Sequence, residues 1–268
     1  MNELAAKLSQ LKLALLSRQL DTLLAEATQK NLSLAAALQW LADLELEHRR
    51  QGAILRRFRC SRLQAQPTIE EFHFPHHKSR MQAKNRILRL LDLDFIAQGT
   101  NVILIGNPGT GKTFLAKILG WRACQANQRV LFVAAMDMLN HLLASQADHS
   151  LVRKLKLYTD PTFVIIDELG YLSLDQQTSN LFYQVISTRH SQRRSTLITT
   201  NTAFSDWGNI LFNTTIATAI ADRLVENSEI FLLAGDSLRK AKKSQSLAGS
   251  AQAPRCDDNP EPRRSPAG

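Results

Sequence analysis

The sequence predicts an α/β protein with a parallel five-stranded sheet flanked by helices, preceded by a small all-helical domain. Two observations predict this fold class. Five short apolar runs rich in β-branched residues are separated by helical stretches, as in βα units on a parallel sheet. These runs lie at residues 101–105, 130–134, 162–166, 195–199 and 228–233. Before residue 75, by contrast, leucines recur at helical spacing.

The N-terminal part predicts at least two helices. Apolar residues repeat with helical period from Leu4 to Ala27, and Asn31 and Ser33 are candidate caps of a second helix that continues into an arginine-rich stretch. Pro75 marks the end of this part. The predicted division is a helical domain at residues 1–75 that binds DNA or a partner, an α/β domain at 76–239 and a disordered, basic, proline-rich tail at 240–268.

Composition narrows the class of protein. The chain has 268 residues, a formal net charge of +9 and 44% hydrophobic residues, which is ordinary for a globular protein. No apolar run approaches the roughly 18–20 residues of a membrane helix, and residues 1–30 lack the apolar core of a signal peptide. The three cysteines are widely scattered, which favours a reducing compartment over a disulfide framework. We expect a cytoplasmic protein without membrane association.

A glycine-rich motif follows the first predicted strand. Residues 106–113 satisfy the P-loop (Walker A) pattern G-x-x-x-x-G-K-[ST]. Its glycines let backbone N–H groups turn towards phosphate at the start of a helix. Lys112 offers a positive charge to the β- and γ-phosphates, and the Thr113 hydroxyl can ligate Mg²⁺. The predicted ATP contacts are Gly106, Asn107, Pro108, Gly109, Thr110, Gly111, Lys112, Thr113 and Phe114.

An acidic pair ends the third predicted strand. Asp167 and Glu168 follow a buried apolar run, where carboxylates are costly unless a cation meets them. Asp167 is placed to hold Mg²⁺, and Glu168 is placed to polarise an attacking water. An Asp-Glu pair favours hydrolysis of ATP over transfer of its phosphoryl group to a metabolite.

Three further polar residues are candidates for the same site. Asn201, at the end of the fourth predicted strand, could orient the water or contact the γ-phosphate, or it could be a turn residue. Arg223 lies in an apolar helical segment and is either an ion-pairing residue or an arginine finger for a neighbouring subunit. Arg239 is a candidate contact to nucleotide in its own subunit.

Basic residues cluster at residues 49–62 without an intervening acid, which makes this stretch a candidate for binding the DNA backbone. A solvated helix face is the alternative. The candidate DNA contacts are Arg49, Arg50, Arg56, Arg57, Arg59 and Arg62. A second basic set follows at His76, His77, Lys78, Arg80, Lys84, Arg86 and Arg89.

The segments GNPGTGKTFLA, VIIDELGYL, ITTN, ATAIADRL and GDSLR occur in that order. Together they resemble IstB, the ATP-binding helper of insertion sequences that encode an IstA/IstB pair, over about residues 4–240. IstB is similar to DnaC-type helicase loaders within the AAA+ ATPases. The resemblance implies an AAA+ fold and ATP-promoted self-assembly on duplex DNA, which is remodelled for an IstA-type transposase.

The resemblance also implies roles for single residues. Lys112 and Thr113 match the Walker A pair, and Asp167 and Glu168 match Walker B. The remaining matches are Asn201 with sensor 1, Arg223 with the arginine finger and Arg239 with sensor 2.

The main hypothesis from the sequence is an ATP-dependent, DNA-binding helper of transposition that hydrolyses ATP with Mg²⁺. A DnaC-like helicase loader, which would bind a helicase ring and prefer single-stranded DNA, is the alternative. A nucleotide switch that binds only protein is the third possibility.

Overall fold

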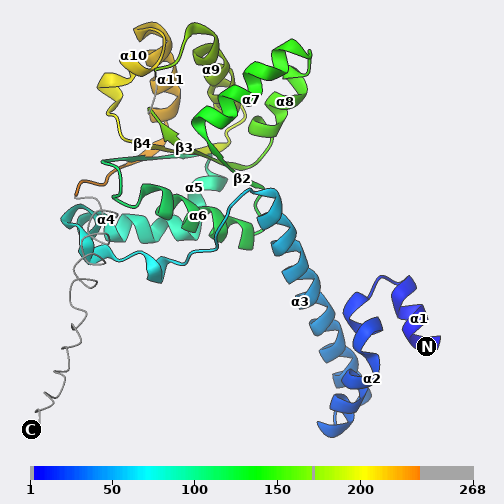
Figure 1. Cartoon of the computed structure of the whole chain (residues 1–268). Coiled ribbons are helices and arrows are strands. Elements are labelled where there is room, and N and C mark those ends of the chain that lie inside the picture. The colour runs from blue at the N-terminus through cyan, green and yellow to red at the C-terminus, as the bar shows by residue number, and fades with distance from the viewer. Residues whose placement is uncertain (1–2, 171–172, 236–268) are drawn as a thin grey trace, which may run out of the picture.

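The computed structural model describes residues 3–170 and 173–235. A five-stranded sheet lies at the centre, helices cover both of its faces, and the three N-terminal helices extend away from this body (Figure 1). The predicted tail at 240–268 and the candidate contact Arg239 lie outside the described residues.

All five strands are parallel, in the order β2-β3-β4-β1-β5. The strands are β1 (Asn101–Ile105), β2 (Val130–Ala134), β3 (Phe163–Leu169), β4 (Ser195–Thr200) and β5 (Ser228–Leu232). The predicted strands are therefore confirmed to within a few residues at each end. Strand β1 is buried along its whole length, because helices cover both faces of the parallel sheet. A strand buried on both faces needs a continuous apolar sequence.

The two faces of the sheet carry separate apolar cores. Helices α4 to α6 lie on one face, and helices α7 to α11 lie on the other (Figure 1). The first set is α4 (Lys78–Arg89), α5 (Asp94–Ala97) and α6 (Lys112–Gln125). The second set is α7 (Ala135–Ala147), α8 (Leu151–Thr159), α9 (Gln176–Ser191), α10 (Trp207–Ile210) and α11 (Thr214–Val225).

The N-terminal region contains three helices, α1 (Glu3–Gln10), α2 (Ala14–Gln29) and α3 (Leu34–Cys60). The leucine-rich run from Leu4 to Ala27 is thus two helices, because Lys12 adopts a left-handed φ of 59° between them. Glu45 of α3 closes the break by accepting hydrogen bonds from the backbone N–H groups at the start of α2. Ser33 caps α3 by accepting from the Ala36 N–H, which confirms one of its two candidate caps.

The far end of α3 packs on the α/β body. The Phe132 N–H of β2 donates to the Ser61 carbonyl oxygen over 2.7 Å. Phe58 meets Trp121 of α6 edge-to-face, with ring centroids 5.4 Å apart. The division of the chain at residue 75 stays a prediction. No helix within the described residues is long and apolar enough to cross a membrane.

Candidate nucleotide site

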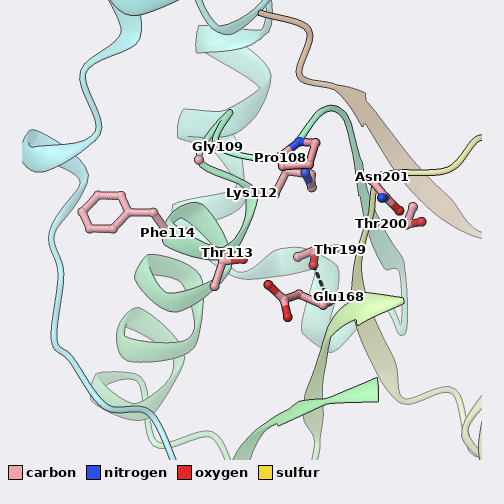
Figure 2. Close-up of a pocket in the computed structure, with 10 residues that line it drawn as sticks. Pro108, Gly109, Lys112, Thr113, Phe114, Glu168, Thr199, Thr200 and Asn201 are labelled. Atoms are coloured by element: carbon pink, nitrogen blue, oxygen red, sulfur yellow. Dashed lines mark hydrogen bonds between the residues drawn. The ribbon is translucent and has the colours of Figure 1, made fainter. Parts of the chain in front are cut away.

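The Walker A loop connects the carboxyl end of β1 to the amino end of α6. Gly109 and Gly111 have φ angles of 84° and 88°, in the left-handed region that glycine enters without steric cost. A pocket opens beside the loop (Figure 2). Its walls are formed by Pro108, Gly109, Gly111, Lys112, Thr113, Phe114, Glu168, Thr199, Thr200 and Asn201.

Lys112 lies over the loop. Its ammonium group donates to the carbonyl oxygens of Gly106 and Asn107, over 2.6 Å and 2.9 Å. Thr110 is fully buried and its hydroxyl donates to the Asn107 carbonyl oxygen, so this residue stabilises the conformation of the loop from its buried side. Of the nine nucleotide contacts predicted in residues 106–114, six line the pocket, and Gly106, Asn107 and Thr110 belong to the loop without lining it.

The acidic pair lies at an irregularity in the sheet. The register between β3 and β4 shifts between Ile166 and Leu169, and Glu168 takes a left-handed φ of 61°. Asp167 is turned inward and is 6% exposed, whereas Glu168 is exposed and lines the pocket. In Figure 2 the Glu168 carboxylate points towards the side of the pocket where Thr113 lies. Two consecutive carboxylates thus have different surroundings.

Thr199 of β4 joins these two acidic residues. Its hydroxyl donates to Asp167 Oδ1 over 2.5 Å and accepts from the Glu168 N–H over 2.9 Å. Asp167 Oδ1 also accepts from the Thr113 hydroxyl over 2.9 Å. Thr199 is not among the predicted site residues, because only the alignment of β3 beside β4 shows which threonine faces the acidic pair.

The donor set fits Mg²⁺. A threonine hydroxyl and a carboxylate oxygen are hard oxygen ligands, and Thr113 and Asp167 already bring theirs together. Within the described residues no group of three His, Cys, Asp or Glu side chains could hold a metal. A magnesium ion here would be bound in the manner usual for nucleotide sites, by one or two protein oxygens together with phosphate and water.

The three further candidates for the site, Asn201, Arg223 and Arg239, differ in their positions relative to the pocket. Arg223 of α11 does not line the pocket. Its Nη1 donates to the Ala219 carbonyl oxygen over 2.8 Å, and its guanidinium lies 4.9 Å from the centroid of the Tyr183 ring. Arg239 lies outside the residues that the structure describes. Asn201 does line the pocket, with its side-chain oxygen accepting from the Thr202 hydroxyl.

The candidate DNA-contacting arginines differ in their surroundings. Arg49 and Arg50 are exposed but are paired with Glu45 and Glu47. The others lie towards the far end of α3. There Arg57 donates to the Asn127 side chain, and Arg62 interacts with the Tyr158 hydroxyl. Arg56 and Arg59 are exposed on α3.

The second basic set does not form one exposed surface. Arg80 is buried against the Walker A loop, where its Nε and Nη2 donate to the Thr110 carbonyl oxygen. It is therefore unavailable to DNA, although it belongs to this basic set in the sequence. Arg86 contacts Glu229 and the Ile230 carbonyl oxygen.

Solved structures share this fold. The chain is similar to the crystal structure of the DnaC helicase loader, with a TM-score of 0.52 and 21% identity over 59% of this chain and 91% of the loader. It is also similar to AMPPCP-bound DnaA from Aquifex aeolicus, with a TM-score of 0.55 and 17% identity over 72% of this chain and 58% of DnaA. The chain has the AAA+ P-loop fold, as its motifs predict.

The family model described as IstB-like ATP binding protein matches residues 6–246. The chain is 33% identical, over 96% of its length and 97% of the relative, to a protein named as an ATP-binding protein of insertion sequence IS21 from Pseudomonas aeruginosa. A counterpart named for insertion sequence IS5376 of Geobacillus stearothermophilus is 35% identical over 81% of this chain and 85% of the relative. The protein belongs to the IstB-like ATP-binding family.

Proposed function

We propose that this protein hydrolyses ATP at the Walker A pocket and uses the ATP cycle to control its assembly on duplex DNA. The position of Glu168 carries the proposal. Of two consecutive carboxylates, the bulge turns Asp167 inward to Thr113 and leaves Glu168 exposed in the pocket. This is the arrangement that hydrolysis requires, with one carboxylate at the metal and one free to act on water.

Lys112 and Thr113 bind the phosphates and the metal in this proposal. The Lys112 ammonium group exchanges its loop carbonyl partners for the β- and γ-phosphates, which offer it charged acceptors. Thr113 and Asp167 hold Mg²⁺, which neutralises charge that develops on the phosphates. Gly106 to Phe114 surround the phosphate chain, and Arg239 contacts the nucleotide from the same subunit.

Glu168 accepts a proton from the attacking water, and Asn201 orients that water or contacts the γ-phosphate. Both residues line the pocket: Glu168 belongs to β3, and Asn201 directly follows the neighbouring strand β4. Thr199 connects the two acidic residues, because its single hydroxyl bonds to the Asp167 carboxylate and to the backbone N–H of Glu168. This linkage holds the water-activating and metal-binding carboxylates at fixed relative positions.

Arg223 completes the site of a neighbouring subunit. Within one chain it lies on α11 away from the pocket, so an arginine finger in this position acts only between subunits. ATP bound at the junction of two subunits therefore promotes self-association, and hydrolysis weakens it. The assembly is an oligomer whose stability depends on the bound nucleotide.

Duplex DNA and an IstA-type transposase are the proposed partners. Relatives that match 96% and 81% of this chain are named for insertion sequences, which supports a role in transposition. The likeness to a DnaC helicase loader is a likeness of fold and does not favour loading of a helicase over this role. Arg56 and Arg59, which are exposed on α3, are the proposed contacts to the DNA backbone.

A binding experiment tests the proposal. Duplex and single-stranded probes are titrated with the purified full chain across a salt series, with ATP, with ADP and without nucleotide, while the size of the complexes is measured. We expect large complexes on duplex DNA that require ATP and weaken steeply with salt. Binding confined to single strands would favour the helicase-loader alternative. Binding indifferent to nucleotide and salt would contradict both roles and favour a protein-binding switch.

A further inference from the structure

Arg80 is a buried arginine that contacts the Walker A loop at Thr110. It lies in the first turn of α4 and is 2% exposed. Its Nε and Nη2 both donate to the Thr110 carbonyl oxygen, over 3.1 Å and 2.5 Å. Its Nη1 donates to the His73 carbonyl oxygen over 3.1 Å, and the guanidinium lies 4.2 Å from the centroid of the Phe72 ring.

The positive charge of Arg80 has no carboxylate partner within residues 3–170 and 173–235. Its hydrogen-bond acceptors are backbone carbonyls. Burial lowers the pKa of Arg80, but the guanidinium stays protonated because an arginine in a protein does not lose its proton near neutral pH. A positive charge that no carboxylate of the described residues pairs with is thus held close to the Walker A loop. Burying a guanidinium without an anion beside it costs free energy of folding. This cost indicates that the charge of Arg80 has a function at this position.

The two bonds to Thr110 also fix a peptide group. The C=O and N–H of a trans peptide point in opposite directions. With the Thr110 carbonyl held against Arg80, the Gly111 N–H faces away from Arg80. Gly111 lines the pocket. A Cβ on Gly111 would lie 2.1 Å from Arg80 Nη2, so the glycine of the motif also makes room for the guanidinium.

We propose that Arg80 is a positioning residue of the nucleotide site, which orients the Thr110–Gly111 peptide so that the Gly111 N–H meets phosphate and which adds a positive charge behind the loop. The inference rests on the proposed nucleotide site at the Walker A loop. The ligands it concerns are nucleoside di- and triphosphates. Because electrostatic attraction grows with the charge of the anion, the effect of Arg80 is larger for ADP and ATP than for AMP.

A purely structural role for Arg80 makes a different prediction. Arg80 connects the segment containing Phe72 and His73 to the loop, so its loss could lower the melting temperature and leave the affinity of the folded protein unchanged. The two roles are separated by measuring binding and stability on the same variants. Arg86→Gln is the matched control, since Arg86 also lies on α4, donates to a backbone carbonyl and has its guanidinium 4.5 Å from a phenyl ring centroid, that of Phe231.

The experiment uses the full chain and the variants Arg80→Gln, Arg80→Lys, Arg86→Gln and Lys112→Ala. A fluorescent ADP analogue is titrated, and ADP, ATP and AMP are used as competitors, below the melting temperature of each variant. We expect Arg80→Gln to weaken ADP and ATP by about tenfold or more and AMP by less than about threefold. Arg80→Lys keeps the positive charge but loses the two parallel hydrogen bonds to Thr110. Its affinities for ADP and ATP should therefore lie between those of the wild type and those of Arg80→Gln. Arg86→Gln binds as the wild type does.

The outcomes distinguish this inference from the proposed function. If Lys112→Ala binds ATP as tightly as the wild type, the proposed nucleotide site is wrong. If Lys112→Ala loses binding while Arg80→Gln keeps wild-type affinity and merely melts earlier, the site stands and the role of Arg80 is structural. If Arg80→Gln does not fold, Arg80→Lys decides: weaker ADP binding supports positioning, and unchanged ADP binding overturns it.

Discussion

The Thr113 hydroxyl lies 2.9 Å from Asp167 Oδ1, although 54 positions separate the two residues in the chain. Thr113 lies in the first turn of α6, the helix after β1, and Asp167 lies near the end of β3. Strand β4 lies between β1 and β3 in the sheet. The contact therefore depends on the sheet order, and it places a hydroxyl and a carboxylate where a divalent cation between protein and phosphate needs them.

Glu168→Gln is expected to separate hydrolysis from binding. The amide cannot accept a proton from water, so kcat for ATP hydrolysis should fall by about 100-fold or more. The Kd for ATP should change by less than about threefold, because Asp167 and Lys112 remain. Steady-state hydrolysis and equilibrium binding check this, with Glu26→Gln on α2 as the control. Unchanged turnover in Glu168→Gln would assign water activation to another residue.

Thr199→Val should impair catalysis while Thr199→Ser preserves it. Valine has the shape of threonine but lacks the hydroxyl that bonds to Asp167 and to the Glu168 backbone. The loss leaves a buried carboxylate with one donor fewer, and we expect kcat to fall by about tenfold. The serine variant retains the hydroxyl and serves as the matched control. Equal turnover in all three proteins would show that the linkage has no part in hydrolysis.

Mixing experiments test whether Arg223 acts between subunits. Arg223→Ala and Lys112→Ala should each hydrolyse ATP at a small fraction of the wild-type rate, about 1% or less. A mixture of the two should recover part of the activity, because the Lys112→Ala subunit still offers its Arg223 to an intact neighbouring site. The control is the double variant in one chain, which has no such site. A mixture that remains as inactive as its components would contradict action in trans.

Glu45 should make the N-terminal helices sensitive to acid. Burial disfavours ionisation of Glu45, but hydrogen bonds from Leu16, Leu15, Arg49 and Ala14 outweigh it and lower its pKa below 4.5. A lowered folded-state pKa contributes stability that is present above pH 4.5 and is lost as the pH falls through the folded pKa.

Glu45→Gln should therefore cost about 1–3 kcal/mol of unfolding free energy for these helices near neutral pH. The difference from the wild type should shrink below pH 4.5. Denaturant unfolding followed by helical circular dichroism at several pH values measures both effects. The control is Glu47→Gln on the same helix, where an exposed ion pair with Arg50 should matter little. A difference independent of pH would mean that the negative charge of Glu45 is not its stabilising feature.

Arg56 and Arg59, exposed on α3, should contribute to duplex binding through phosphate contacts. Replacing Arg56 and Arg59 by Gln should weaken ATP-dependent binding and reduce the slope of log affinity against log salt by about 2. Arg50→Gln is the comparison, because Arg50 is bound by Glu47 on the same helix. An unchanged slope in the double variant would move the DNA-binding surface away from this part of α3.

The sequence predicted most of the fold because its signals are local. Continuous apolar runs such as residues 101–105 have one stable place, inside a sheet covered on both faces. The Walker A loop was predictable for the same reason, since its glycines and Lys112 are adjacent in the chain. The break at Lys12 was missed, because leucine spacing is helical on both sides of it and the left-handed turn leaves no apolar signature.

Thr199 and Arg80 could not be assigned from the sequence. A threonine in a strand and an arginine in a basic run are both ordinary, and what distinguishes these two is which backbone group or carboxylate lies opposite. The parallel α/β fold, the phosphate loop and the acidic pair follow from the sequence, because each depends on residues close together in the chain. The contacts of Thr199 with Asp167 and Glu168, and of Arg80 with Gly111, depend on strand order and helix packing, which bring distant segments of the chain together.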